Sequence, residues 1–301
     1  MERTESKDIN DLVSYFENKR KHRLFMFVFF IVLASLFGVA GFTLILVAAI
    51  AFSGTAQVIM IVSGFLSFLA ITPSFIVFAM QQSSSYKAEL QKTSFNLLKA
   101  KLPYTNLSFS MKSDSYVIQK TISAPISQKF DFDETEFFKG NINGVPFFSL
   151  IYSYVVREGN HPRNCYGRFL QFDCSITDSE VLVKNLKGKD FFQKIHLPYQ
   201  RTTESLSFND QFKVFGEDQN KLNAFLDSVR IDGMRFLNEE HSFNSSFYVN
   251  PFCACVFMDD FNVFTPRLSK KVTEDYLLGF KNELELPLEV SKILEIKQAN
   301  S

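Results

Sequence analysis

Residues 24–52 read LFMFVFFIVLASLFGVAGFTLILVAAIAF, an apolar run without a charged side chain. The run is longer than the roughly 20 residues that cross a hydrocarbon core as an α-helix. After a five-residue connector, residues 58–80 repeat the pattern and include Pro73, which a membrane helix tolerates. No Asp, Glu, Lys or Arg occurs in residues 24–86. The sequence therefore predicts a transmembrane helical hairpin over residues 24–80.

The length of the two runs separates this hairpin from its alternatives. A cleaved signal peptide has an apolar region of about 7 to 15 residues followed by a small-residue cleavage site. Both runs are longer than that. A buried hairpin in a soluble protein is the other alternative, but two uncharged runs of this length are rare in soluble cores. We therefore expect an integral membrane protein with two spans, for which the lipid bilayer is the first partner.

The charged flanks of the hairpin predict its orientation. Lysine and arginine are enriched in segments that stay on the cytoplasmic side of a membrane, and here they flank both runs and are absent from the connector. We therefore expect both termini in the cytoplasm. The runs contain no ionisable side chain, which argues against a channel or transporter. The flanking residues are Lys19, Arg20, Lys21 and Arg23 before the first run, and Lys87, Lys92, Lys99 and Lys101 after the second.

Four segments follow from these patterns. Residues 1–23 form a cytoplasmic segment, either a short amphipathic helix or a frayed tail, and residues 24–80 form the hairpin. Residues 81–102 lack Gly and Pro and predict a juxtamembrane helix, which ends at Pro103. Residues 103–301 form a cytoplasmic domain.

Small residues four apart offer faces for close helix approach within the hairpin, namely Ala34 with Gly38 and Ser63 with Ser67.

The cytoplasmic domain mixes strand and helix patterns. Residues 145–156 and 166–176 are the strongest strand candidates and predict a hairpin. We therefore expect an α+β fold, in which a mainly antiparallel sheet with flanking helices follows the N-terminal transmembrane helical hairpin. Further strands are expected at 206–215 and 246–258, and helices at 114–126, 217–239, 269–282 and 286–297, the last two separated near Pro287.

Several short motifs resemble one bacterial family. After the two-span hairpin, the chain has Leu-Pro-Tyr at 102–104, Phe-Lys-Gly-Asn-Ile-Asn-Gly at 138–144, Gly-Arg-Phe at 167–169 and Phe-Lys-Val-Phe-Gly-Glu-Asp-Gln at 212–219. In this order they resemble the family called Domain of Unknown Function 3137, over about residues 95–266. The resemblance implies the same architecture, a bacterial origin and location in the inner membrane. It implies no catalytic residue, and the segment around Cys253 and Cys255 departs from the family pattern.

Cys253 and Cys255 are the weak candidates for a metal site. They flank Ala254 in an apolar, strand-like run, where alternation places both sulfur atoms on one face. A thiolate pair can bind a soft metal or act as a redox pair, but zinc needs about four ligands. We expect ordinary buried cysteines, with no metal and no cofactor. A cytoplasmic location also disfavours structural disulfides.

Other chemistry has little support. Lys plus Arg and Asp plus Glu number 32 each, so no net positive charge attracts nucleic acid. No GxSxG, GxGxxG or phosphate-binding loop is present, and the acidic cluster at 131–136 lacks the Gly of an EF-hand loop. Asp259 and Asp260 are typical of a strand-end turn. Cys165 with His241 stays open as a nucleophilic pair assembled in space, and His161 and His196 stand at no metal-ligand spacing.

Phenylalanine is abundant, with 36 residues, and it often occurs in adjacent pairs. In a strand, the two members of such a pair point to opposite faces, so both faces need a cover. Helices, a partner subunit or lipid can supply it. We therefore expect a membrane-anchored interaction or assembly module with a protein partner or self-association. The alternatives are a membrane-tethered enzyme with an unrecognised hydrolase-like site and a lipid-contacting domain.

Overall fold

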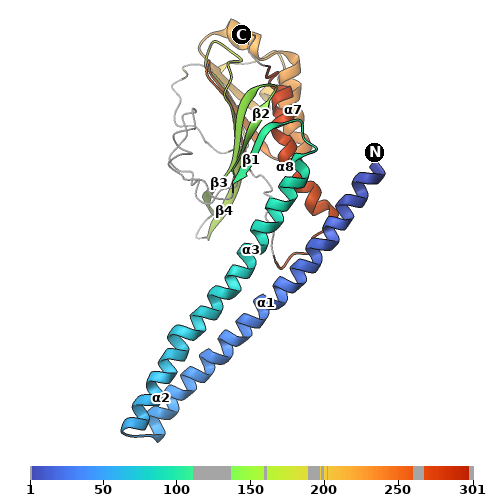
Figure 1. The fold of residues 1–301 in the computed structure, drawn as a ribbon. Helices are drawn as coiled ribbons and strands as arrows, with labels where there is room; N and C mark the ends of the chain where they lie inside the picture. Colours follow the sequence, from blue (N-terminus) through green and yellow to red (C-terminus); the bar gives the residue numbers. More distant parts are fainter. Residues whose placement is uncertain are drawn as a thin grey trace. The chain divides into compact units, whose positions relative to one another are not determined.

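A computed structural model of the chain describes residues 2–110, 137–158, 161–188, 197, 200–201, 203–259 and 268–297. The chain folds into two units. The first comprises Met1–Asn96 and Phe264–Phe280, and the second comprises Leu97–Val263 and Lys281–Ser301. The first unit is helical and the second is α+β, as Figure 1 shows. The helix expected at 114–126 lies outside the described residues.

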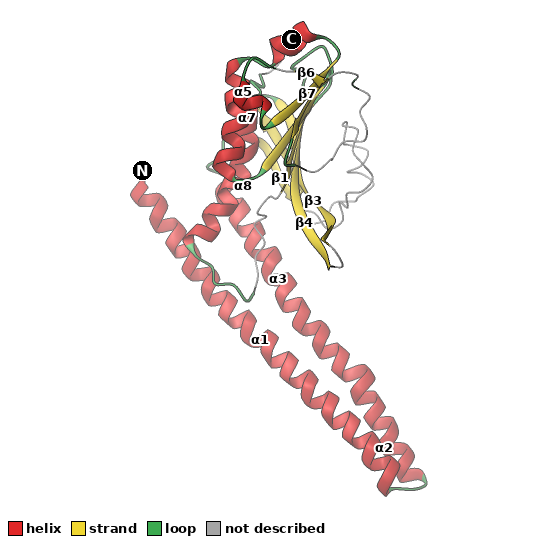
Figure 2. Ribbon diagram, turned by 180° about the vertical axis from the view of Figure 1, so that it is seen from behind, coloured by secondary structure: helices red, strands yellow, loops and turns green. Residues whose placement is uncertain are grey.

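The two apolar runs form an antiparallel helical hairpin. Helix α1 covers Glu2–Ala51, and the return arm consists of α2 (Thr55–Leu66), the π-helical turn η1 (Ser67–Ile71) and α3 (Thr72–Lys99). The two arms lie side by side in both views (Figures 1 and 2). Both arms are long and apolar enough to cross a membrane. Residues 11–23 are part of the same continuous helix, so α1 has no break where the uncharged run begins.

The π-helical turn occurs where Pro73 enters the return arm. Proline has no backbone N–H and its ring collides with the carbonyl group four residues earlier in a regular α-helix. The wider turn, in which the Thr72 N–H donates to the carbonyl oxygen of Ser67, precedes the proline. The Thr72 hydroxyl donates to the same oxygen over 3.0 Å. Local π geometry therefore accommodates the proline without ending the helix.

Small residues join the two arms of the hairpin. A Cβ atom added to Gly41 would lie 2.8 Å from the carbonyl oxygen of Gly64, and one added to Gly64 would lie 2.7 Å from that of Gly41. The Ser67 hydroxyl donates to the carbonyl oxygen of Phe37 over 2.9 Å, and Ala34 is also buried. The expectation for Ser63 was wrong, because Ser63 is exposed and its neighbour Gly64 faces α1.

The second unit contains an antiparallel sheet of nine strands within the described residues, in the order β1-β2-β3-β4-β9-β8-β5-β7-β6. The predicted hairpin of 145–156 and 166–176 is confirmed as β3 and β4, although β4 begins and ends earlier. Asn143 and Gly144 both have positive φ in the two-residue turn between β2 and β3. The strands are β1 Thr105–Ser110, β2 Phe137–Ile142, β3 Val145–Glu158, β4 His161–Phe172, β5 Val181–Asn185, β6 Gln200–Arg201, β7 Phe212–Gly216, β8 Asn244–Val249 and β9 Ala254–Asp259.

Both faces of the sheet are covered, as the phenylalanine pairs predict. Phe147 and Phe148 are both buried but contact different rings: Phe147 lies beside Tyr104 and Phe172, and Phe148 lies beside Phe137 and Phe169. Helix α7 (Ser228–His241) and the part of α8 (Glu274–Ile293) that begins at Lys281 cover one face (Figure 2). Phe148 belongs to an apolar cluster that contains Cys253 and Cys255 on the other face.

Two expected elements are confirmed only in part between residues 206 and 239, where β7 and the helices α6 and α7 lie. The first part of the expected strand 206–215 is the helical turn α5 (Leu206–Asn209), because the Ser205 hydroxyl caps it by accepting from the Phe208 N–H. The expected helix 217–239 is divided into α6 (Gln219–Phe225) and α7. Asp227 starts the second helix, since its carboxylate accepts from the Arg230 N–H over 2.9 Å.

Two further corrections concern the C-terminal third. The stretch 246–258 is a hairpin of β8 and β9, because the Asn250 side chain accepts from the Phe252 and Cys253 N–H groups and closes a turn. The two helices expected around Pro287 are one helix, α8, that continues through it. Proline disturbs the helical hydrogen bonds of the preceding turn. The Leu284 carbonyl oxygen in that turn accepts a hydrogen bond from the Tyr104 hydroxyl over 2.6 Å.

Candidate functional site

The paired cysteines lie on the sheet face opposite α7 and α8. The Sγ atoms of Cys253 and Cys255 are 3.6 Å apart, and the Cys255 thiol lies 3.6 Å from the Gln171 side-chain oxygen. Both cysteines are almost completely buried, at 1% and 0% exposure. In the described part of the chain, no group of three or more His, Cys, Asp and Glu side chains is arranged to hold a metal ion.

The thiols differ in acidity. A hydrogen bond from Cys255 lowers the pKa of the Cys253 thiol, and burial raises the pKa of the Cys255 thiol. Burial also raises the pKa of the nearby Cys174 thiol to about 12. Because the more acidic thiol is itself buried, reagents in solution have little access to it. The structural role of these cysteines stays a prediction.

The structure does not bring the other candidate residues into a reactive group. Cys165 belongs to the apolar cluster of the sheet, whereas the His241 ring lies 2.7 Å from the Glu289 carboxylate and stacks on Phe243. No hydrogen bond links Cys165 to His241 in the described residues. The Asp259 carboxylate is buried and accepts from the Tyr154 hydroxyl. The acidic cluster 131–136, His196, Asp260 and the side chain of His161 lie outside what the structure describes.

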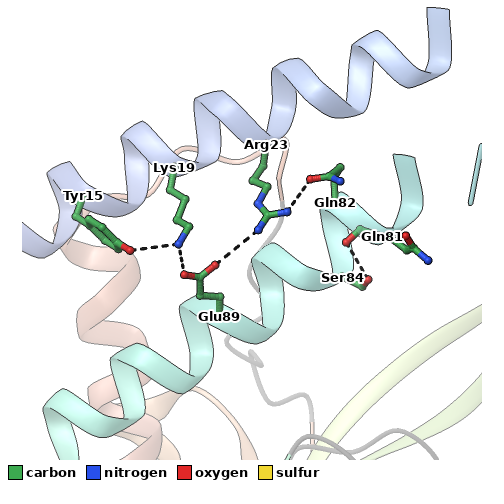
Figure 3. Close-up of polar contacts among 7 residues, drawn as sticks. All are labelled: Tyr15, Lys19, Arg23, Gln81, Gln82, Ser84 and Glu89. Carbon is green, nitrogen blue, oxygen red and sulfur yellow. Dashed lines mark hydrogen bonds and ion pairs between the residues drawn. The ribbon is translucent and has the colours of Figure 1, made fainter. Parts of the chain in front are cut away.

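A polar layer joins α1 and α3 where the uncharged runs end. Lys19 of α1 forms an ion pair with Glu89 of α3, and Arg23 donates to the Gln82 side-chain oxygen over 2.7 Å. The Arg23 guanidinium also lies 4.0 Å from the Glu89 carboxylate, and the Tyr15 hydroxyl accepts from Lys19 over 3.2 Å. Figure 3 shows these side chains pointing toward one another across the helix pair. The layer holds the two helices in one register.

A second group of contacts fastens residues 268–280 to α1. The Glu17 carboxylate pairs with Arg20, at 2.7 Å, and accepts from the Val272 backbone N–H at 3.2 Å. Arg20 donates to the carbonyl oxygen of Leu268 over 3.0 Å. Phe16 and Val272 are buried in the same unit, with exposed fractions of 0% and 1%. A segment that follows the sheet in sequence therefore belongs to the helical unit.

Sequence reasoning found the cations of this layer but not its acceptors. Glu17 and Glu89 are isolated acidic residues within basic flanks, and their place there is the signal that each has a fixed cationic partner. The layer pairs cations of α1 with acceptors on α1 and α3, and this pairing supports a structural or recognition role.

No family model, no curated protein and no solved structure matches the chain. The resemblance to Domain of Unknown Function 3137 therefore stays a prediction. The function has to be inferred from the geometry of the chain itself.

The substitution Glu17→Gln is expected to loosen residues 268–280 from α1. It replaces a charge-assisted hydrogen bond to the Val272 N–H by a neutral one, which lowers its contribution from about 1.5 to 3 kcal/mol to about 0.5 to 1.5 kcal/mol. Amide exchange at Val272 should rise by about fivefold or more. Glu89→Gln is the matched control, since the ion pairs of Glu89 are with Lys19 and Arg23 and not with residues 268–280. Equal exchange in both variants would contradict this role of Glu17.

Proposed function

We propose that the protein is a two-span membrane anchor that holds an α+β interaction or assembly module at the cytoplasmic face of a membrane. One observation carries the anchor: the helical hairpin buries small residues between its arms and exposes large apolar ones. Ala34 is 4% exposed, whereas Ile50 is 85% exposed. Other exposed side chains of this kind are Phe25, Val39, Val58, Leu69 and Met80.

This arrangement suits lipid better than water. In water, apolar area is favourably buried at roughly 25 cal/mol per Å², so a soluble hairpin buries its large side chains and exposes its small ones. In lipid, the large side chains face acyl chains at no such cost, and small residues allow the helix backbones to approach. The Gly41 and Gly64 contact is of this second kind. The packing therefore supports the membrane-spanning assignment beyond the composition of the runs.

Exposed apolar side chains on the second unit support the module. On α7, Ile231, Met234 and Leu237 are buried, whereas Val229 and Phe236 are 61% and 60% exposed. These two lie seven residues apart, hence on one face of the helix. Phe252, in the turn between β8 and β9, is 79% exposed. Val229 and Phe236 together give α7 an exposed apolar face, and we place the contact with a partner there.

A photo-crosslinking residue at position 236, in the full chain in native membranes, tests the interaction module. Alkaline extraction and a C-terminal reporter test the membrane anchor. We expect several-fold more adduct from position 236 than from position 239, because Glu239 is exposed on the same helix but is charged. The protein should resist alkaline extraction, and a reporter fused at residue 301 should be active only in the cytoplasm. Equal adduct yields would contradict the module, and extraction of the protein or a reporter active outside the cytoplasm would contradict the anchor.

A further inference from the structure

The inference concerns the cations at the cytoplasmic end of the proposed anchor and rests on that proposed function. Six lysine and arginine side chains but only two carboxylates occur in residues 17–23 and 87–92. Both carboxylates are already engaged, Glu17 by Arg20 and Glu89 by Lys19 and Arg23. Most of the excess positive charge therefore lies on the remaining lysines, Lys21, Lys87 and Lys92.

Among the described residues, Lys21, Lys87 and Lys92 form no ion pair, although the charge of Lys21 helps to lower the pKa of the Glu17 carboxyl. Lys92 lies about 7.5 Å further along α3 than Lys87, away from the apolar runs. Lys21 is exposed and Lys87 is partly exposed. An ammonium group is a strongly hydrated point charge on a flexible stem and readily meets a phosphate oxygen. Lys21 and Lys87 therefore present free donors on both helices of the hairpin.

The proposed anchor would place these two lysines near the depth of lipid headgroups. The contacts Lys19 to Glu89 and Arg23 to Gln82 fix the register of α1 against α3. At 1.5 Å per residue, Lys21 lies about 4.5 Å beyond the start of the first run at Leu24, and Lys87 about 10.5 Å beyond the end of the second run at Met80. The headgroup layer on each side of a bilayer is about 5 to 8 Å thick. When the uncharged runs fill the hydrocarbon core, Lys21 therefore lies within this layer, and the flexible side chain of Lys87 reaches back to it.

We propose that Lys21 and Lys87 bind the phosphate groups of anionic phospholipids at this end of the hairpin. The ligand is a lipid rather than a soluble phosphate, because the donors flank two helices whose apolar side chains face outward and give acyl chains a surface beside them. Anionic lipids on a cytoplasmic leaflet attract basic residues next to a membrane span in this way. The ion pairs of Glu17 and Glu89 remove the two carboxylates that would otherwise repel the phosphate.

The test uses the full chain purified in a neutral detergent and titrated with phosphatidylglycerol or phosphatidylcholine of the same acyl chains. Native mass spectrometry counts the lipids retained. We expect phosphatidylglycerol to bind more tightly, and the variant Lys21→Gln/Lys87→Gln to lose about fivefold in its affinity for each lysine removed. Binding of phosphatidylcholine should change little. Inorganic phosphate at the same concentration should not displace the lipid.

A charge-matched control is Lys187→Gln/Lys213→Gln, which removes two exposed lysines from the second unit. Equal affinity of the wild type for the two lipids, equal losses in the two variants, or displacement by inorganic phosphate would each overturn the lipid site. Alkaline extraction of native membranes that contain the wild-type protein separates the lipid site from the membrane anchor. If the protein stays in the membrane but shows no lipid preference, the lipid site alone fails; if it is extracted, the anchor fails and the site with it.

Discussion

Replacing Arg168 by alanine is expected to lower the stability of the second unit by about 3 to 5 kcal/mol. Arg168 lies on β4 and forms an ion pair with Glu283 of α8, and their side chains are 1% and 5% exposed. The Arg168 guanidinium also donates to the Ser149 hydroxyl over 3.1 Å and lies 5.1 Å from the centre of the Phe138 ring. The variant leaves the Glu283 carboxylate buried without its cation.

The companion variant Arg168→Met/Glu283→Leu separates a buried charge from a lost contact. Apolar residues of similar size often replace a buried ion pair without loss of stability, so the double variant should be much closer to the wild type than Arg168→Ala. The chain has no tryptophan, and hydrogen exchange measured peptide by peptide reports on each unit separately. The strands β3 and β4 and the helix α8 are the segments to follow. A double variant as unstable as Arg168→Ala would show that the cost comes from packing and not from charge.

Alanine at Gly41 or at Gly64 is expected to destabilise the helical hairpin by about 1 to 3 kcal/mol. The added Cβ atom would lie 2.8 Å or 2.7 Å from a backbone carbonyl oxygen of the opposite arm. A backbone atom cannot move aside as a flexible side chain can, so the arms must separate. The loss of close contact exceeds the gain of up to about 1 kcal/mol in helix propensity from glycine to alanine. Reversible unfolding in mixed detergent micelles measures the difference.

Gly38→Ala is the matched control on the same helix. The nearest atoms to its added Cβ belong to Thr72 and lie 3.6 Å away, which is ordinary van der Waals contact. Its stability should therefore stay within about 0.5 kcal/mol of the wild type or rise slightly. A loss at Gly38 equal to the losses at Gly41 and Gly64 would mean that the small residues do not set the distance between the arms.

Features that depend on neighbouring residues could be predicted from the sequence. The hairpin of helices follows from an uncharged apolar run, which is a property of consecutive residues. The pairing of β3 with β4 and the opposite directions of Phe147 and Phe148 follow from alternation. The contact between the Cys253 and Cys255 sulfur atoms follows from the same period of two.

Element boundaries were predicted less well, because local capping contacts and helix interruptions are weak signals. Asp227 begins a new helix inside a stripe that reads as one, and Asn250 closes a turn inside a run that reads as one strand. At Pro287 the opposite occurs, since α8 continues through a residue that usually ends a helix. Buried neighbours such as Leu284 and Val290 hold both sides of this proline in the same unit.

Contacts between distant residues came only from the tertiary structure. Arg168 and Glu283 are 115 positions apart, and Glu17 and Val272 are 255 apart. In the sequence each is an ordinary charged or apolar residue, because what makes the pair consequential is burial beside its partner. Burial and partnership depend on how the whole chain packs, whereas charge, hydrophobicity and period are present in each short segment before it folds.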